Sequence, residues 1–309
     1  GAWLLFHDRD WRRAAWFLLP AAALGAWLAI LWHTTGYLLG DPGFAHYNVG
    51  YQLHPVRLAA TLVRRVYYLF FADFRFLGLL VSFWAIRFAR IYQRWEWTVA
   101  AYYVGGHLLL VTGFGGAALE RYLLPVFPLL YLCMATLWAA VRPRLRYVSQ
   151  ITMLAGLFSG LYWNPPFPFP LENNLALIDF VELQKAGAEF LEKTRPGESV
   201  ASAWPYTAGL RNPDLGFVQR GRRTVETSDF HADHVATAVR AGRPDLLVTY
   251  SRTWEPEWGA LGNRLVRAFL TRYYDYEPQI TSAEIEERFG MHAILRWEQR
   301  GQWIEIYSR

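Results

Sequence analysis

The sequence predicts a polytopic α-helical membrane domain, with about five transmembrane helices and an interfacial helix, followed by a small extracytoplasmic α/β domain. Three observations lead to this fold class. Apolar segments near the bilayer-spanning length of roughly 17–25 residues follow one another in the first half of the chain. Arginine clusters separate several of them, and tryptophans stand near their ends. After residue 170 the apolar runs become short and alternate with amphipathic segments.

The composition restricts the class of protein. Of the 309 residues 53% are hydrophobic, yet the mean hydropathy is only +0.07, so the apolar residues must be concentrated in part of the chain. That part is 1–163, the predicted membrane domain. The formal charge of +5 is not gathered on a basic helix or a nucleic-acid motif, so we expect no nucleic acid as partner. Cys133 is the one cysteine, which excludes a disulfide within the chain and a cysteine-based metal site.

Arginines set the orientation of the predicted spans. They precede the first span, follow the second and follow the fourth. Loops on the cytoplasmic side of a membrane carry an excess of arginine and lysine, so these three positions are cytoplasmic. The loops 33–73 and 113–121, and the chain after Trp163, are then extracytoplasmic. We therefore expect a multi-pass protein of the plasma (inner) membrane, in contact with the lipid bilayer. The five predicted spans are Ala14–Trp32, Phe74–Ile86, Trp97–Thr112, Tyr122–Val141 and Tyr147–Trp163.

The segment from Pro55 to Phe71 has a different pattern, because polar residues recur at helical spacing on one face and apolar residues on the other. This pattern predicts a helix that lies in the plane of the membrane interface. Two interpretations of its arginines stay open: contact with anionic lipid headgroups, or binding of a lipid-linked phosphate by Arg64 or Arg65. The polar face comprises Arg57, Thr61, Arg64, Arg65 and Tyr68.

A proline-rich linker, 164–170, separates the membrane domain from the extracytoplasmic domain, 171–309. In this second domain short runs rich in β-branched residues predict strands, amphipathic runs predict helices, and Arg300-Gly301 predicts the turn of a final hairpin. The predicted helices are Leu175–Lys193, Ala232–Ala241 and Leu261–Tyr273, and the predicted strands are Ser199–Ala203, Thr224–Thr227, Asp245–Tyr250, His292–Trp297 and Trp303–Tyr307.

Acidic and histidine side chains crowd together at Asp229, His231, Asp233 and His234. Two histidines three residues apart can share a helical face and bind a metal, but no third, distant ligand is evident in the sequence. A helix cap formed by Ser228 or Asp229 explains the acids better, since helix N-termini favour acidic residues. We therefore expect no metal site.

The predicted spans hold almost no ionisable residues. This argues against a transporter, because buried charge usually marks a transport path through a membrane. His107 is the main exception, and we expect it to be a hydrogen-bonded packing residue rather than a proton carrier.

Glu120, Arg121 and Tyr122 open the fourth predicted span from its outer side, and Pro125 and Pro128 follow within it. Considered alone, the triplet has a simple explanation: Glu120 faces the positive helix terminus, and Arg121 pairs with it or extends to the interface. The run Glu-Arg-Tyr-x-x-Pro also resembles a segment in the late transmembrane helices of GT-C glycosyltransferases, of the protein-mannosyltransferase and aminoarabinose-transferase kind. These enzymes take a sugar from a polyprenyl-phosphate donor.

The resemblance implies an inverting transferase in which Arg121 contacts the phosphate of the lipid carrier; the pattern of the interfacial helix adds Arg64 and Arg65 as further phosphate-binding candidates. Glu120 and Tyr122 would belong to a loop that contacts donor or acceptor. A lipid-linked sugar phosphate is then the substrate, and an unidentified molecule of the cell envelope is the acceptor. The absence of a Walker loop and of a strand-linked Gly-x-Gly-x-x-Gly agrees with a lipid-borne donor rather than a bound nucleotide.

The loop that precedes the predicted interfacial helix also resembles the outer loop of bacterial members of this family. It adds His46 and Asn48 as candidate contacts of donor or acceptor. The family's general base is an aspartate in an early outer loop, and the one acid in the corresponding part of this loop, Asp41, stands in a Gly-Asp-Pro-Gly turn that we interpret as structural. We therefore expect the base upstream of this chain, no catalytic residue within it, and no activity of the chain alone.

Two other functions stay open. The first is a non-enzymatic, membrane-anchored protein whose extracytoplasmic domain binds a cell-envelope partner. The second is a transporter, which the scarcity of charge in the spans already disfavours. Binding in 171–309 alone would favour the first, whereas a donor site in 1–163 would favour the transferase.

Overall fold

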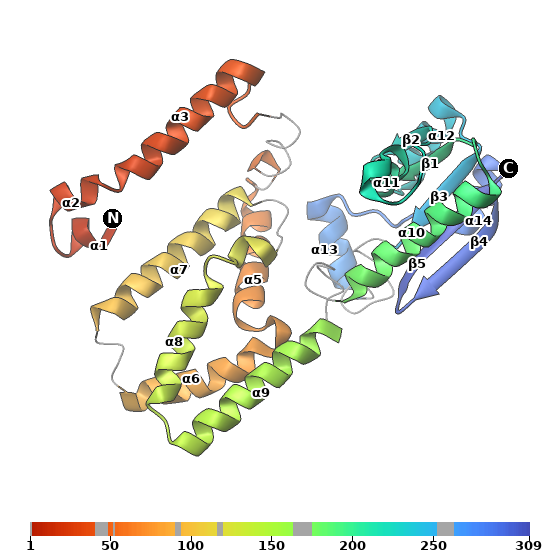
Figure 1. Cartoon of the computed structure of the whole chain (residues 1–309). Helices are drawn as coiled ribbons and strands as arrows, with labels where there is room; N and C mark the ends of the chain where they lie inside the picture. The colour runs from red at the N-terminus through yellow and green to blue at the C-terminus, as the bar shows by residue number, and fades with distance from the viewer. Residues whose placement is uncertain are drawn as a thin grey trace. The chain divides into compact units, whose positions relative to one another are not determined.

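A computed structural model of the chain describes residues 2–40, 49–51, 53–89, 94–115, 120–162, 175–251 and 263–309. The chain divides into two compact units, Gly1–Gly160 and Leu161–Arg309. The described part of the first unit is helical, and the second unit combines helices with a sheet (Figure 1). The predicted linker, 164–170, lies outside the described residues.

The first unit consists of helices of very different lengths. Proline at the start of α5 and near the start of α8 suits the first helical turn, where the missing N–H has no partner to lose. The elements are α1 (Ala2–Phe6), α2 (Trp11–Ala15), α3 (Leu18–Thr35), α5 (Pro55–Phe70), η2 (Ala72–Phe74), α6 (Arg75–Ala89), α7 (Trp95–Phe114), η4 (Glu120–Leu123), α8 (Phe127–Ala139) and α9 (Pro143–Tyr162).

The prediction of five transmembrane helices is wrong. Among the described residues, one helical run has the length and composition to cross a membrane: Trp11–Thr35, which covers the first predicted span and is almost entirely exposed. A signal sequence has the same length and composition. Helix α5 and the stretch Ala72–Ile86, bent by 41° at their junction, pass the same test only as a pair. The described chain therefore contains one such helix, or two if this pair is a single broken span.

Length and polar residues explain why the other predicted spans fail. The fourth prediction, Tyr122–Val141, divides into the short turn η4 and the 13-residue helix α8, well below the roughly 20 residues that a span needs. The second, Phe74–Ile86, becomes the 15-residue helix α6. Helices α7 and α9, at the third and fifth predictions, have 20 residues each, but Tyr102, Tyr103 and His107 reduce the apolar character of α7, and α9 begins with Arg144 and Arg146.

The predicted interfacial helix exists as α5, but its orientation differs from the expectation. Thr61, Arg65 and Tyr68, all on the predicted polar face, are buried against the protein, whereas Val63 on the opposite side is 69% exposed. The polar face of α5 therefore contacts other helices of the unit rather than lipid headgroups.

Helices α5 to α9 share one apolar core. Leu69 of α5, Leu123 of η4, Met134 and Trp138 of α8 and Met153 of α9 are all buried in it. Gly78 in α6 permits this packing, because a Cβ there would lie 3.0 Å from Met153 Sδ and 3.1 Å from Trp138 Cζ2. This core fixes the positions of α5 and η4, the two segments that carry the predicted phosphate-binding arginines.

The second unit contains a mixed five-stranded sheet with the order β2-β1-β3-β5-β4. The first three strands are parallel, and β5 pairs antiparallel with both β3 and β4. Helix α12 forms the crossover from β2 to β3, and α10 packs against β5. The elements are α10 (Ala176–Thr194), β1 (Val200–Ala203), α11 (Tyr206–Arg211), η6 (Pro213–Leu215), β2 (Thr224–Thr227), α12 (Ala232–Gly242), β3 (Leu246–Tyr250), α13 (Arg264–Tyr274), α14 (Ser282–Phe289), β4 (His292–Gln299) and β5 (Gln302–Ser308).

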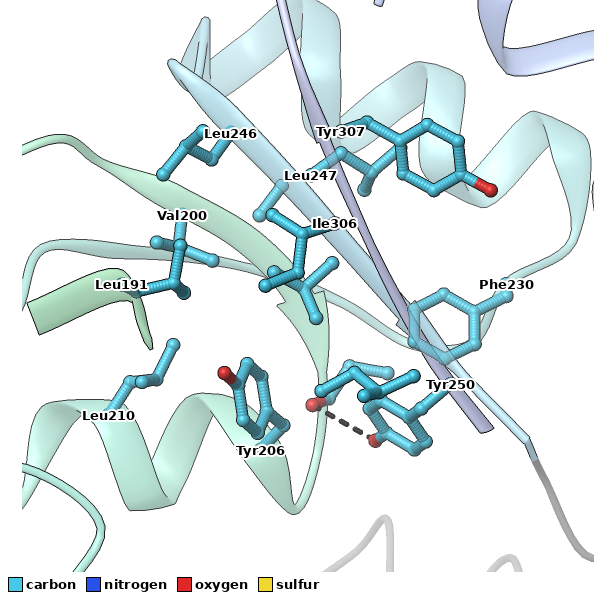
Figure 2. Close-up of a cluster of buried hydrophobic side chains, with 14 of the residues drawn as sticks. Leu191, Val200, Tyr206, Leu210, Phe230, Leu246, Leu247, Tyr250, Ile306 and Tyr307 are labelled. Atoms are coloured by element: carbon cyan, nitrogen blue, oxygen red, sulfur yellow. Dashed lines mark hydrogen bonds between the residues drawn. The ribbon is translucent and has the colours of Figure 1, made fainter. Parts of the chain in front are cut away.

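The central strands supply the core of this unit. Val200, Leu247 and Ile306 come from β1, β3 and β5 and are completely buried. Near one end of the core the rings of Phe230 and Tyr250 meet edge to face with their centroids 4.9 Å apart (Figure 2). Tyr250 Oη donates a hydrogen bond of 2.7 Å to the carbonyl of Trp204. The buried phenol is thereby paired, and the end of β3 is joined to the end of β1.

The strands and helices predicted for the second unit are present in the structure. All five predicted strands are present, and β2 has the predicted bounds. The hairpin turn is also confirmed: Arg300 and Gly301 both have positive φ, 47° and 80°, as a two-residue turn between antiparallel strands requires. Helices α11 and α14 were not predicted. The prediction that Ser228 or Asp229 caps α12 is wrong, because the N-cap residue is His231 and makes no side-chain cap bond.

Candidate functional site

Arg65 joins the two segments that the sequence marks for phosphate binding. It lies on α5 and is 0% exposed, with its guanidinium 5.3 Å from the centroid of the Tyr122 ring in η4. Its Nη2 donates a hydrogen bond of 2.9 Å to the carbonyl of Gly115, the residue that ends α7. One buried cation of α5 therefore contacts both the end of α7 and the turn η4, some 50 residues further along the chain.

Glycine at position 115 makes this contact possible. A Cβ there would lie 2.8 Å from Arg65 Nη2, which is closer than real side chains come, and 3.2 Å from the Tyr122 ring, which would have to shift. The same Cβ would lie 2.5 Å from the carbonyl oxygen of Val111, one turn back in α7. Any larger residue at the end of α7 would therefore displace Arg65, Tyr122 or the helix end itself.

His107 holds the Glu-Arg-Tyr turn from the side of α7. Its Nε2 lies 2.7 Å from the backbone oxygen of Tyr122, and its ring stacks on Tyr103 with centroids 6.3 Å apart. A protonated Nε2 is required to donate to this carbonyl. The expectation that His107 is a hydrogen-bonded packing residue is confirmed.

Arg121 and Arg64 are two further cations of the region around Arg65 and Tyr122. Arg121 belongs to η4, between Glu120 and Tyr122, and its side chain is exposed. Arg64 is half-buried on α5 and donates from Nε and Nη2 to the hydroxyl of Tyr68, at 3.3 and 3.1 Å. Glu120 is placed in η4 by its backbone, whereas His46, Asn48 and Asp41 lie outside the described residues.

Arg75, at the start of α6, is a further cation of this region; the sequence places it at the outer edge of the second predicted span but indicates no role for it. It is 6% exposed, pairs with Asp73 at 2.7 Å and donates to the hydroxyl of Tyr131 at 3.1 Å. Its guanidinium lies 4.3 Å from the centroid of the Phe127 ring. The signal that could have found it is an arginine inside an apolar run, because burying that charge requires partners. Arg75 joins α6 to α8, as Arg65 joins α5 to η4.

The arrangement brings Arg65 of α5 onto Tyr122 of η4, where exposed Arg121 is the preceding residue, and Arg64 donates along α5 to Tyr68. Arginine offers a planar fork of donors that matches phosphate oxygens. Because Arg65 is buried, its contribution is to hold the turn, and Arg121 and Arg64 are the cations with access to a ligand. The arrangement is suited to holding a phosphate beside an apolar protein surface.

Comparisons with known proteins supply no family for this chain. No protein-family model matches it, and neither does any curated protein or solved structure. The resemblance to GT-C glycosyltransferases therefore stays a prediction based on the Glu-Arg-Tyr-x-x-Pro run.

Proposed function

We propose that this site binds the phosphate of a lipid-linked sugar, and that the chain forms the donor-binding part of a glycosyltransferase that uses a polyprenyl-phosphate sugar. The observation that carries the proposal is the contact of buried Arg65 with Tyr122, which joins α5 to the Glu-Arg-Tyr turn. The helix α5 and the turn η4, which the sequence marks independently for phosphate binding, are thus in direct contact.

Charge supports this assignment. In sugar transfer from such a donor, the carrier phosphate is the leaving group and gains negative charge as the bond to the sugar breaks. A guanidinium that is already in place lowers the energy of that charge without having to reorganise. Arg121 is suited to this role because its backbone is fixed by two contacts of Tyr122: the carbonyl with His107 and the ring with Arg65.

The surface of the first unit supports a lipid environment. Large apolar side chains are widely exposed on its helices, far beyond the scattered single residues that a water-facing surface carries. Those of α3 belong to the run that can cross a membrane. Examples from four helices are Leu18 and Leu24 of α3, Phe83 of α6, Leu109 of α7, and Ile151 and Phe158 of α9.

The test is donor-lipid binding by the full chain in lipid nanodiscs. Polyprenyl phosphate is compared with the polyprenol of the same length, which has the same tail and no charge. We expect the phosphate to bind and the alcohol to bind at least about tenfold more weakly, because charge-assisted hydrogen bonds contribute about 1.5–3 kcal/mol each. Arg121→Ala should lower the affinity for the phosphate by about tenfold or more.

Arg142→Ala is the matched control, since Arg142 is also an exposed arginine beside α8 but follows that helix at its other end. It should leave the affinity unchanged. Equal binding of phosphate and alcohol, or equal losses in Arg121→Ala and Arg142→Ala, would show that the lipid is held by its tail or by general positive charge. Either result would refute the proposed function.

A further inference from the structure

A group of metal-binding side chains lies in the second unit, where β2 ends and α12 begins. Asp229, His231 and His234 each place one ligand atom within 4.8 Å of the others. The two imidazoles stack with centroids 5.7 Å apart, so both face the same side of the loop. In Figure 1 this loop runs between the neighbouring elements β2 and α12. The group belongs to neither the arginine site nor the apolar core.

A further carboxylate near this group comes from a distant part of the chain. The N–H of Ile280 donates to the carbonyl of Phe230 at 2.8 Å, which fixes the segment before α14 along the loop after β2. This pairing brings Glu277 Oε2 to 3.7 Å from His231 Nδ1. The sequence alone shows no third distant ligand because this contact depends on the tertiary fold.

The distances fit a small tetrahedral ion. With metal–ligand bonds near 2.0–2.2 Å, two ligand atoms on a tetrahedral Zn²⁺ are about 3.3 Å apart. The corresponding distances here are 2.7 Å between His234 Nδ1 and Asp229 Oδ1, and 3.5 Å between His231 Nδ1 and Asp229 Oδ2. Glu277 Oε2 lies 3.7 Å from His231 Nδ1, and its side chain is 66% exposed. Binding of one ion would require Asp229, which turns a different oxygen to each histidine, and exposed Glu277 to rotate toward a common centre.

The loop is held in place before any ion binds. Phe230, between the ligands, is 1% exposed and anchors the loop in the core. Thr227 Oγ1 donates to the carbonyl of Asp229 at 2.8 Å, and the N–H of His231 donates to Asp229 Oδ1 at 2.9 Å. Such outer contacts orient the ligands of metal sites and raise their affinity. His234 is about half exposed, which leaves a route from solvent.

We propose that Asp229, His231, His234 and Glu277 form a binding site for a divalent transition-metal ion of the Zn²⁺ type. Two imidazoles with two carboxylates favour Zn²⁺ over Mg²⁺ or Ca²⁺, which prefer oxygen ligands alone. The site lies beyond the carboxyl end of a parallel strand, the edge at which open α/β sheets bind their ligands. This site is independent of the proposed phosphate site, and the prediction of no metal is revised here by the position of Glu277.

Metal binding by the full chain tests the proposal, in detergent micelles and after removal of any polyhistidine tag. Zn²⁺ bound at equilibrium is measured by elemental analysis, and Co²⁺ is added as a probe because its visible absorption is intense only in tetrahedral sites. We expect one ion per chain and a tetrahedral Co²⁺ spectrum. His231→Ala and His234→Ala should each weaken binding by about 100-fold or more, and Glu277→Gln by about tenfold.

His292→Ala is the matched control. His292 also contacts a carboxylate, with Nδ1 2.9 Å from Glu286 Oε1, and is similarly exposed, but it belongs to no larger group of ligands among the described residues. It should bind Zn²⁺ as the unchanged chain does. Hydrogen exchange in β2 and α12 verifies that each variant is folded, and Asp229→Asn serves as a further ligand variant if one histidine variant is not. Absence of stoichiometric binding, or an equal loss in His292→Ala, would overturn the proposal.

Discussion

Arg65 carries a guanidinium that is entirely removed from water. Such burial costs several kcal/mol unless hydrogen bonds and charge contacts offset it. The Gly115 carbonyl and the Tyr122 ring contribute to that compensation, and both belong to segments that Arg65 thereby fixes. A lysine in its place would keep the charge but lose the planar fork that reaches both partners. The contacts of Arg65 therefore depend on the planar shape of the guanidinium and not on its charge alone.

Asp245, in the second unit, has a carboxylate whose ionisation stabilises the fold. Its carboxylate accepts hydrogen bonds from the N–H and the hydroxyl of Ser199, at 2.8 and 2.7 Å. The backbone bond, followed by the hydroxyl bond, lowers the pKa of Asp245 below its ordinary value. These bonds fasten the start of β3 to the start of β1.

The pH dependence follows from the sign of this shift. A carboxylate with a lowered pKa stabilises the fold when it is ionised, so the contribution is complete above the unfolded pKa of about 4 and is lost as the pH falls below it. We expect the stability advantage of the unchanged chain over Asp245→Asn to shrink between about pH 5 and pH 2. Protection factors of the Val200 and Leu246 amides measure it, and an advantage that stays constant with pH would contradict it.

Helix α12 illustrates how an element is positioned by one small residue. Gly242 ends the helix against β2, and a Cβ there would lie 2.4 and 2.6 Å from the two methyl carbons of Val225. Valine has a stiff side chain on a fixed strand, so it cannot move aside easily. Gly242→Ala should therefore destabilise the second unit by about 1–3 kcal/mol, despite the better helix propensity of alanine.

Two variants control this prediction. Val225→Ala in the same chain removes the methyl carbons and should recover part of the loss. Gly106→Ala in α7, where a Cβ meets nothing within 4 Å, should be neutral or stabilising by up to about 1 kcal/mol. Denaturant-dependent hydrogen exchange measures each free energy of unfolding. A Gly242→Ala chain as stable as the original would show that α12 shifts without cost.

The elements predicted correctly are those whose signals are local. Strand β2 follows from a short run rich in β-branched residues, and the turn follows from the Arg300-Gly301 pair between two such runs, where glycine tolerates the positive φ that the structure shows. Helix α14 has an equally local signal that was overlooked: Thr281 and Glu284 form a capping box, with hydrogen bonds in both directions. The order of the strands and the contact of Arg65 with Tyr122 depend on tertiary packing across long stretches of chain, and no local pattern encodes them.

The predicted membrane domain fails at the scale of the whole molecule for a related reason. An apolar run in the sequence becomes a span only if its helix stays unbroken over the length of the run. Pro125 and the turn η4 shorten one such run, and another, Phe74–Ile86, forms only the 15-residue helix α6, which starts after the bend that follows α5. What remains is a first unit with a widely exposed apolar surface and one long apolar helix near its start. Its relation to lipid is therefore best tested on that helix.

We expect the run Trp11–Thr35 to anchor the chain in a membrane. Leu24 and Trp27 lie near its centre and are 58% and 57% exposed. An arginine at the centre of a span costs about 3 kcal/mol, so Leu24→Arg with Trp27→Arg should cost about 6 kcal/mol and release the chain from membranes on carbonate extraction. Trp11→Arg is the control, because a long side chain at the end of a span extends into the interface at little cost.

The alternatives give different results in this experiment. If the original chain is itself released by carbonate, no helix of the first unit is inserted, and the lipid setting of the phosphate site is wrong. If the double variant stays in the membrane, the anchor lies elsewhere in the unit, and the bent pair α5–α6 is the next candidate by length and composition. Because that pair also carries Arg64, Arg65 and Arg75, the second result would place the arginine site itself at the membrane.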